Sequence, residues 1–398
     1  MHSISEALDL IKACAKSFGV EDVSIHDAHN RVLAENVYAD RDYPPFNRSA
    51  MDGYAVLSSD FKDKKIHELK LIERLHAGHV AKEKVISDTC IKIMTGAPVP
   101  EGADAVIRVE DTIEKNGLVG FKVDYVWSLQ NIASQAEDAI KGDLIIKKDV
   151  VLDATTLPVL AVVGKSTVKV HKLPEIVVAS TGNEIVAVED KIKPHQIRDS
   201  NSYSLKSFFR QYCISSITSI KVADDKVKLK ESLKNFLKAD ILILSGGVSK
   251  GDADYVPEVL TSLGVVEVFH RVKIKPGNPL WFGRTPSGGV VFGLPGNPVA
   301  VQIACKVFIE PYLRGCFNME VIQPMFLPLF LEKMKKTKFD EYFPCKIINK
   351  NRTTGVVPTR MNGSGDIAAT LGSDGIAIHP ADTDKLSENS VVEFYLWK

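Results

Sequence analysis

The chain has 398 residues with 50 Lys and Arg against 50 Asp and Glu, so its formal net charge is zero. Its 45% apolar and 25% charged shares are those of a globular protein, which excludes long disorder, a collagen-like chain and a coiled coil. A balanced charge offers no general attraction to nucleic acid or acidic membranes, and no run reaches the roughly 18–20 apolar residues that a bilayer requires. Glu6 and Asp9 stand where a signal peptide has basic and apolar residues, which favours a cytoplasmic protein.

The first part of the chain is predicted to combine a helical domain with a β-rich insertion. Apolar residues at helical spacing from residue 4 to 15, closed by Gly19, predict an N-terminal helix. From PPFNRSAMDGYAV to about residue 138 the runs are short, alternating and broken by Gly and Pro, which predicts strands. A helical or mixed stretch returns at 149–163. We therefore expect a split N-terminal domain, 1–44 and 139–172, and an inserted β-rich domain, 45–138.

Residues 173–318 are predicted to form a doubly wound α/β domain. The runs EIVVAS, DILILSGG and GVVFGLPGNP are short, continuous and apolar, which is typical of strands buried on both faces. Amphipathic helices are expected at about 201–213 and 225–238, and again after 255 and 298. Such alternation predicts a parallel sheet with helices on both sides.

The tail, residues 319–398, is predicted to be a small β domain, because its strands are short and separated by many turns. Its basic run KMKKTK (333–338) is interpreted as a solvated linker or loop. The expected fold class is therefore α/β plus β, in a multidomain chain.

Three predicted strands run directly into polar, glycine-containing loops, at 180–184, 245–255 and 293–298. Loops that follow parallel strands emerge at one edge of the sheet, where ligands bind. Loop glycines allow backbone N–H groups to approach an anion closely. Together the three loops predict a ligand site, although each alone is typical of an ordinary turn between a strand and a helix.

The middle loop contains Gly246 and Gly251 but is not a Walker A loop, because Asp252 stands where that motif requires Lys. Asp252 and Asp254 instead place carboxylates beside the expected phosphate site. Carboxylates in that position indicate that Mg²⁺ bridges them to the phosphate. The alternative is that both acids cap the next helix.

The segment HRVKIKPGNP (270–279) is the clearest anion signal. If it is a strand, its alternation places Arg271, Lys273 and Lys275 on one face and the apolar Val272 and Ile274 on the other. Three like charges on one face repel one another, which favours a bound anion that compensates them. The alternative is a solvated edge strand protected by lysines.

A set of motifs then occurs in a fixed order: PPFNRSAMDGYAV, IMTGAPVPEGADAV, EDAIKGD, STGNE, DSNSY, LSGGVSKGDADYV, KIKPGNPLWFG and GLPGNPVAV. This set resembles the MoeA-type molybdopterin molybdotransferases, a family that includes the E domain of gephyrin. The resemblance extends over essentially the whole chain. GLPGNP is shared with related molybdopterin-binding domains, whereas PPFxxSAMDGYA together with SGGxSxGxxDY is highly specific.

The resemblance implies a homodimer whose subunits have the four parts described above. It also implies a reaction in which molybdenum from molybdate enters adenylylated molybdopterin and AMP leaves with the help of Mg²⁺. The implied partners are a molybdopterin adenylyltransferase and the proteins that mature molybdoenzymes, with neither nucleic acid nor a membrane involved.

The candidate site residues follow from the loops, the alternation and the resemblance taken together. Carboxylates that the resemblance places in the β-rich domain are expected to reach the site across a dimer cleft. The candidates are, as catalytic residues, Asp52, Asp138, Glu184, Asp224, Asp254 and Lys275; as substrate-binding residues, Thr95, Ser245, Gly246, Gly247, Ser249, Arg271, Lys273, Pro295, Pro298 and Ser364; and as Mg²⁺ ligands, Asp254 and Glu184.

The chain departs from the family pattern at three places. Residues 132–136 carry no positive charge where relatives often have an Arg-rich run, Asn278 replaces the second lysine of K-P-G-K-P, and Ala300 replaces a small hydroxyl residue. We expect these changes to affect how molybdate is held, and we expect Lys273 to compensate for the missing lysine. Two other readings stay open: a non-catalytic scaffold protein that binds molybdopterin, and an enzyme that inserts tungstate.

Overall fold

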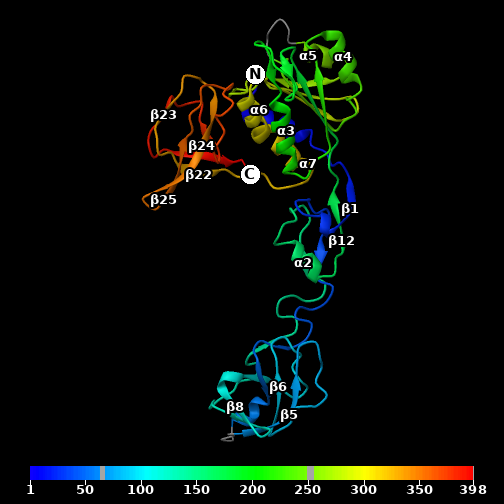
Figure 1. The fold of residues 1–398 in the computed structure, drawn as a ribbon, viewed down its shortest axis with the longest axis vertical. Coiled ribbons are helices and arrows are strands. Elements are labelled where there is room, and N and C mark those ends of the chain that lie inside the picture. Colours follow the sequence, from blue (N-terminus) through cyan, green and yellow to red (C-terminus); the bar gives the residue numbers. More distant parts are fainter. Residues whose placement is uncertain (63–67, 249–254, 398) are drawn as a thin grey trace. The chain divides into compact units, whose positions relative to one another are not determined.

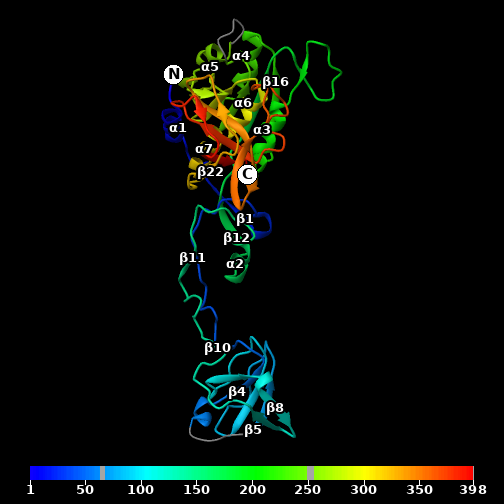
Figure 2. The same ribbon diagram turned by 90° about the vertical axis from the view of Figure 1, so that its left-hand side faces the viewer.

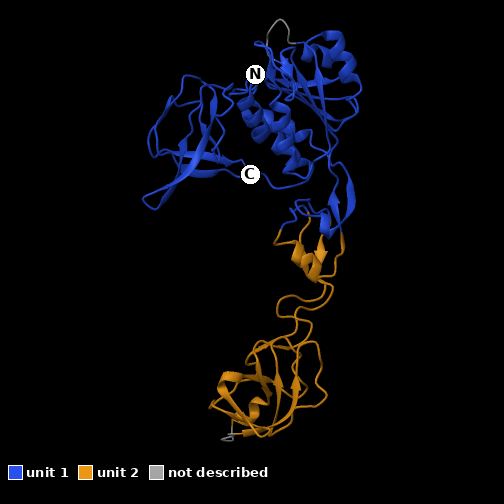
Figure 3. Cartoon of the chain, in the orientation of Figure 1, with its two compact units in different colours: residues 1–34, 149–153, 168–398 blue, residues 35–148, 154–167 orange. Residues whose placement is uncertain are grey.

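The computed structural model describes residues 1–62, 68–248 and 255–397. The chain divides into two compact units: unit 1 comprises 1–34, 149–153 and 168–398, and unit 2 comprises 35–148 and 154–167 (Figure 3). The four-part division expected from the sequence stays a prediction. Among the described residues, no helix is both long and apolar enough to cross a membrane.

Unit 1 contains a six-stranded sheet in the order β16-β13-β17-β21-β20-β18. The first four strands are parallel, as predicted, whereas β20 runs antiparallel to both of its neighbours, β21 and β18, which the sequence pattern did not predict. The link from β20 to β21 is a short turn, and a short turn can only reverse the chain direction. The strands are β13 (Ile176–Thr181), β16 (Ile217–Val222), β17 (Ile241–Ser245), β18 (Val266–His270), β20 (Trp281–Arg284) and β21 (Val290–Leu294).

Helices cover both faces of this sheet, which confirms the doubly wound arrangement (Figure 1). Successive strand residues point to opposite faces: Ile176 and Val178 pack with α3 and α6, whereas Val177 and Ala179 pack with α4 and α5. The helices are α3 (Asn201–Arg210), α4 (Lys226–Lys234), α5 (Val256–Ser262), α6 (Pro298–Ala304) and α7 (Glu310–Cys316), and a π-helical segment, Cys305–Ile309, joins the last two.

The N-terminal helix α1 (Ile4–Ala13) joins the same core through Ala7 and Ile11. It begins with a capping box, in which the Ser3 hydroxyl accepts from the Glu6 amide and the Glu6 carboxylate accepts from the Ser3 amide. The helix ends at Ala13, several residues before its predicted stop at Gly19. Strands β1 (Val20–Ser24) and β12 (Thr167–His171) pair with each other in a separate two-stranded sheet.

The C-terminal region of unit 1 is a β domain, as predicted. Its sheet has the order β19-β24-β26-β28-β22, with β25 forming a hairpin on β24. The first strand, β19 (Ile274–Lys275), comes from the α/β part of the chain and pairs in parallel with β24, Lys275 opposite Glu341. The others are β22 (Met325–Pro328), β24 (Asp340–Lys350), β25 (Thr353–Pro358), β26 (Gly375–His379) and β28 (Val391–Leu396), with the separate pair β23 (Lys333–Met334) and β27 (Lys385–Leu386).

The interpretation of the basic run 333–338 as a solvated loop was wrong for Lys333 and Lys335, although Lys336 and Lys338 are exposed. Lys335 is buried, and its ammonium donates to the carbonyl oxygens of Phe339, His379 and Pro380. Lys333 lies in β23 and forms an ion pair with the buried Glu341. A run of basic residues in a sequence does not show which lysines contact carbonyl or carboxylate groups, so composition alone gave a wrong prediction for these two.

Unit 2 is β-rich, as predicted. Strands β4, β5 and β8 of its main sheet are labelled in Figure 2. The sheet has the order β7-β4-β6-β5-β9-β8 and encloses a core around Tyr54, Ile91 and Ile107. The strands are β4 (Gly53–Val56), β5 (Glu68–Leu75), β6 (Thr89–Ile93), β7 (Ala105–Arg108), β8 (Thr112–Lys115) and β9 (Leu118–Phe121). The shorter elements of the unit are β2 (Val37–Tyr38), β3 (Arg48–Ser49), β10 (Ile132–Ala133), β11 (Leu144–Ile146) and α2 (Leu157–Val162).

Candidate functional site

The three polar loops that follow β13, β17 and β21 meet around a cavity of about 450 Å³, which we call the loop cavity. Six of the predicted site residues line it: Glu184, Asp224, Ser245, Gly246, Gly247 and Pro295. The carboxyl edge of a parallel sheet therefore gathers these residues, as expected. Ser249 and Asp254, from the same middle loop, lie outside the described residues.

Two glycines allow the loops after β13 and β17 to approach each other closely. Gly246 and Gly247 both have positive φ angles, +99° and +69°. A Cβ on Gly246 would lie 2.7 Å from the carbonyl and hydroxyl oxygens of Thr181. A side chain there would push the two loops apart, so glycine maintains the shape of the cavity.

Asn201 is a cavity residue that the sequence analysis did not identify. It begins α3 and is largely buried, and its Nδ2 donates to Ser245 Oγ at 2.8 Å and to the Gly296 carbonyl at 2.7 Å. Next to it, Asp199 accepts from the Ser180 hydroxyl and the Ser202 amide, which fixes the start of the helix. The DSNSY motif, placed between a strand and a helix, was the available signal.

We predict that Asn201→Asp loosens the loop cavity, because the carboxylate keeps the shape of the amide but cannot donate to the Gly296 carbonyl. A buried acceptor left without its donor costs about 1–3 kcal/mol. Hydrogen exchange should report this as faster exchange in α3 and in residues 293–298. Asn235→Asp, at an exposed position, is the control and should leave both segments unchanged; equal protection in the two variants would contradict the prediction.

A second cavity, of about 650 Å³, lies between the α/β part and the C-terminal β domain of unit 1, and we call it the junction cavity. Lys275, Asn278 and Ser364 line it, together with Lys333 and Glu341. It shares three lining residues with the loop cavity, Pro279, Pro295 and Asn297. The two cavities are therefore neighbours along one wall.

Ser364 links the C-terminal domain to this wall. Its hydroxyl accepts from Asn297 Nδ2 at 2.7 Å, and its carbonyl accepts from the Val299 amide at 3.2 Å. Asn297 immediately precedes α6, whose first residue is Pro298, a candidate that lines neither cavity. The C-terminal loop is thus fixed to the end of the GLPGNP motif.

The segment 271–275 differs from the predicted continuous strand. Burial alternates as expected, with Val272 and Ile274 fully buried, but Arg271 has a φ of +74° and β18 ends before it. The Lys273 amide donates to the carbonyl of His2. The pKa of Glu6 is lowered mainly by the hydrogen bond from the Ser3 amide, and the charge of Lys273 contributes to the same shift. Lys273 and Lys275 are both exposed, as the predicted alternation requires, but Arg271 and Lys273 line neither cavity, so a role of Lys273 beside Lys275 stays a prediction.

In unit 2, Asp52 and Thr95 are in direct contact. The amide and the hydroxyl of Thr95 both donate to Asp52 Oδ1, each at 2.7 Å. These bonds, the amide bond first, lower the pKa of the exposed Asp52 carboxyl below its usual value. Asp138 is also exposed, and its amide donates to the Tyr43 carbonyl at 2.8 Å.

Thr95→Val should therefore raise the pKa of Asp52 towards its usual value, although the retained amide bond keeps it lowered. A carboxyl with a depressed pKa adds stability above its unfolded-state pKa and loses it as the pH falls through the folded-state pKa. Carboxyl NMR titration in the acid range measures the shift. Thr112→Val, elsewhere in unit 2, is the control, and an unchanged Asp52 titration in Thr95→Val would refute the assignment.

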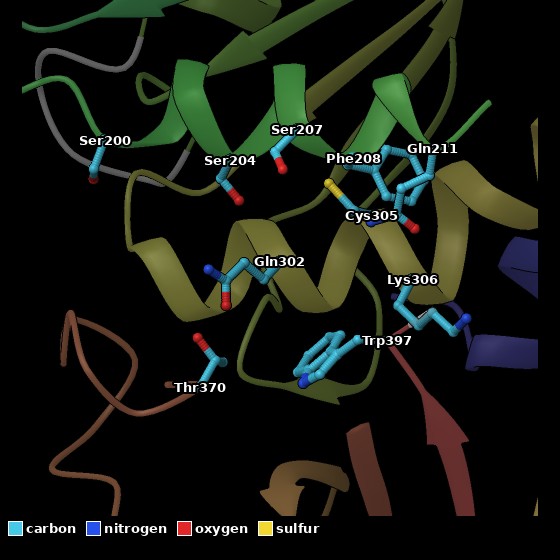
Figure 4. A pocket seen from close by; sticks show the side chains of 10 residues that line it. All are labelled: Ser200, Ser204, Ser207, Phe208, Gln211, Gln302, Cys305, Lys306, Thr370 and Trp397. Atoms are coloured by element: carbon cyan, nitrogen blue, oxygen red, sulfur yellow. The ribbon is translucent and has the colours of Figure 1, made fainter. Parts of the chain in front are cut away.

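A third cavity, of about 420 Å³, lies between α3 and α6 and contains none of the predicted site residues (Figure 4). Ser204 of α3, Gln302 of α6 and Trp397 of the C-terminal strand region line it. Its one lysine, Lys306, is paired with Glu310 at 2.7 Å, so its charge is compensated. We assign this cavity no part in the site.

The carboxylates in the loop cavity are hard oxygen donors of the type that Mg²⁺ prefers. Glu184 and Asp224 both line it, and Glu184 is one of the two predicted metal ligands. Within the described residues, no three His, Cys, Asp or Glu side chains lie close enough to form a complete metal site. The donor type fits Mg²⁺, whereas the predicted ligand Asp254 lies in the undescribed segment.

Comparison with known proteins covers almost the whole chain. Family models match residues 2–164 (MoeA N-terminal region, domains I and II), 177–315 ("Probable molybdopterin binding domain") and 330–397 (MoeA C-terminal region, domain IV). A molybdopterin molybdenumtransferase of Synechocystis sp. is 31% identical, with 100% of both chains covered. Another, from Staphylococcus epidermidis, is 29% identical over 99% of this chain and 95% of its own length.

Solved structures agree with these sequence relatives. The crystal structure of a molybdopterin biosynthesis MoeA protein from Pyrococcus horikoshii has a TM-score of 0.85 and 27% identity, with 100% of both chains covered. The order of the motifs, the three matched regions and the shared fold lead to one conclusion. The chain belongs to the MoeA family of molybdopterin molybdenumtransferases.

Proposed function

We propose that this chain transfers molybdenum from molybdate to adenylylated molybdopterin and releases AMP in an Mg²⁺-dependent step. Family membership gives it a role in molybdenum cofactor biosynthesis as a transferase. The observation that carries the finer proposal is the pair of adjoining cavities. One has glycine loops and carboxylates, the other has lysines, and both share the wall of Pro279, Pro295 and Asn297.

In this proposal the loop cavity holds the pterin and its pyrophosphate. Gly246 and Gly247 line this cavity, and glycines in such a loop allow backbone N–H groups to approach a phosphate closely. Glu184 and Asp254 would hold Mg²⁺, which neutralises phosphate charge when bound. Lys275, in the junction cavity, binds an oxyanion through charge-assisted hydrogen bonds.

Asp52, Thr95 and Asp138 belong to unit 2, and we propose that they act in a two-fold dimer on the site of the partner subunit. Mixing the inactive variants Asp52→Ala and Glu184→Gln should then restore roughly a quarter of the wild-type activity, because half of the dimers are mixed and each has one intact site. Sedimentation should show a dimer. Full activity in a monomer would exclude this arrangement.

The direct test of the function is mass spectrometry of the products formed from adenylylated molybdopterin, with molybdate and tungstate in parallel. AMP and metal-loaded pterin are expected, in the presence of Mg²⁺, with molybdate. Loading with tungstate alone would identify the tungstate-inserting alternative. Binding of the pterin without AMP release would instead identify the scaffold alternative. We further propose that the protein works in the cytoplasm, next to a molybdopterin adenylyltransferase and the proteins that mature molybdoenzymes.

A further inference from the structure

Two lysines and one buried glutamate form a compact cluster in the junction cavity. The Nζ atom of Lys333 lies 2.8 Å from Glu341 Oε1, and that of Lys275 lies 3.5 Å from Oε2. The Glu341 side chain is only 6% exposed, Lys333 is 18% exposed and Lys275 is 51% exposed. All three side chains line the cavity.

The charges of this cluster do not cancel. Burial alone would raise the pKa of Glu341, but the hydrogen bond and charge of Lys333, with the charge of Lys275, lower it below its usual value. The carboxylate is therefore ionised at neutral pH, and two ammonium groups face it. One positive charge is left over at the wall of the cavity, where it favours an anion.

The fold determines the spacing of the two lysines. Lys275 is fixed opposite Glu341 by the parallel pairing of β19 with β24. Lys333 arrives from β23, which is held by β27, and its ammonium lies 4.7 Å from the ring centre of Phe343. The two lysines thus lie on different strands, each paired with a neighbouring strand, and both ammonium groups contact one carboxylate. Little side-chain entropy is therefore lost when an anion binds between them.

We propose that Lys333 is the second cation of the oxyanion site, binding molybdate together with Lys275, and that Glu341 positions both lysines. This inference rests on the proposed function. It replaces the expectation that Lys273 compensates for Asn278, because Lys333 lines the cavity with Lys275 and Lys273 does not. The shared chemistry is a tetrahedral oxyanion, which molybdate and the phosphates of the pterin substrate both present.

Direct binding and turnover together test this proposal. Equilibrium dialysis of the full chain with molybdate alone gives a dissociation constant without any catalysis. Lys333→Gln should weaken it by roughly 10- to 100-fold, as the loss of a charge-assisted contact implies. Lys275→Ala should have an effect of similar size, and Lys333→Arg should stay close to wild type. Lys385→Gln removes a half-exposed lysine from the partner strand β27 and should change nothing.

A double variant separates molybdate binding from mere neutralisation of Glu341. Lys333→Gln with Glu341→Gln keeps the net charge of the cluster and leaves no buried carboxylate unpaired. If Lys333 binds molybdate, the double variant binds as weakly as Lys333→Gln. Recovery of wild-type binding would show that Lys333 only neutralises Glu341, and it would overturn the proposal. Thermal unfolding of each variant identifies any loss of binding that comes from misfolding.

The KM values assign the oxyanion. Lys333→Gln should raise the KM for molybdate and leave the KM for adenylylated molybdopterin unchanged. A rise only in the pterin KM would assign Lys333 to the pyrophosphate, and no change in either binding or KM would leave it without a ligand; both results contradict the proposal. A wild-type chain that binds molybdate through Lys333 but releases no AMP would refute the proposed function and leave this inference intact.

Discussion

Replacing Glu184 by Gln is expected to reduce AMP release by about 100-fold or more, the largest catalytic effect that we predict. The substitution keeps the volume of the side chain and removes the negative charge that would hold Mg²⁺. Glu184 is exposed at the mouth of the loop cavity, so its loss should change the free energy of unfolding by no more than about 0.5 kcal/mol.

The turn before Glu184 places its carboxylate close to the backbone of Gly182. Gly182 has a φ of +144°, and a Cβ there would lie 2.8 Å from both carboxylate oxygens of Glu184. The carboxylate is therefore folded back over the loop that follows β13. Glu189→Gln, at an exposed position outside the cavity lining, is the matched control. Wild-type turnover in Glu184→Gln would remove Glu184 from the mechanism.

Gly53→Ala is expected to destabilise the unit 2 sheet by about 3 kcal/mol, which is the largest structural effect that we predict. A Cβ at Gly53 would lie 2.0 Å from the carbonyl oxygen of Ile107 and 2.9 Å from its carbonyl carbon. These are backbone atoms of β7, the neighbour of β4, and they cannot move without breaking the pairing. Because Asp52 directly precedes Gly53, its carboxylate, which we propose to be catalytic, should be displaced as well.

Hydrogen exchange over β4 and β7 measures this effect locally, which matters in a chain with more than one cooperative unit. Gly78→Ala is the control, since Gly78 has a positive φ of +84° but nothing within 4 Å of an added Cβ. It should cost about 1–2 kcal/mol through backbone strain alone. Equal losses of protection in the two variants would show that lack of space at Gly53 is not the cause.

The loop cavity could be predicted from the sequence because its position follows from the topology of a parallel sheet. Parallel strands that end in polar loops bring those loops to one edge, so Glu184, Ser245 and Pro295 could be grouped without coordinates. The prediction did not include Asn201, since a buried amide that joins the loops after β17 and β21 has the same local pattern as any polar residue at the start of a helix.

The junction cavity could not be predicted in the same way. Lys275 and Glu341 meet because the two-residue strand β19 pairs with β24, and so short a pairing between distant segments leaves no periodic pattern. Alternation over 270–275 did predict which side chains are buried. The prediction of one continuous strand was wrong, because Arg271 has a positive φ and leaves the extended conformation. Val272 and Ile274 nevertheless pack into the hydrophobic core.

The pairing of β19 with β24 has a consequence for exchanging parts between relatives. In a chimera joined at residue 319, β19 would come from this chain and β24 from the relative. The register that places Lys275 opposite residue 341 would then depend on two sequences that do not belong together. Residues 270–279 and 325–397 should therefore be exchanged as one block, although about 45 residues separate them along the chain. Successful transplants should carry both segments from the same donor.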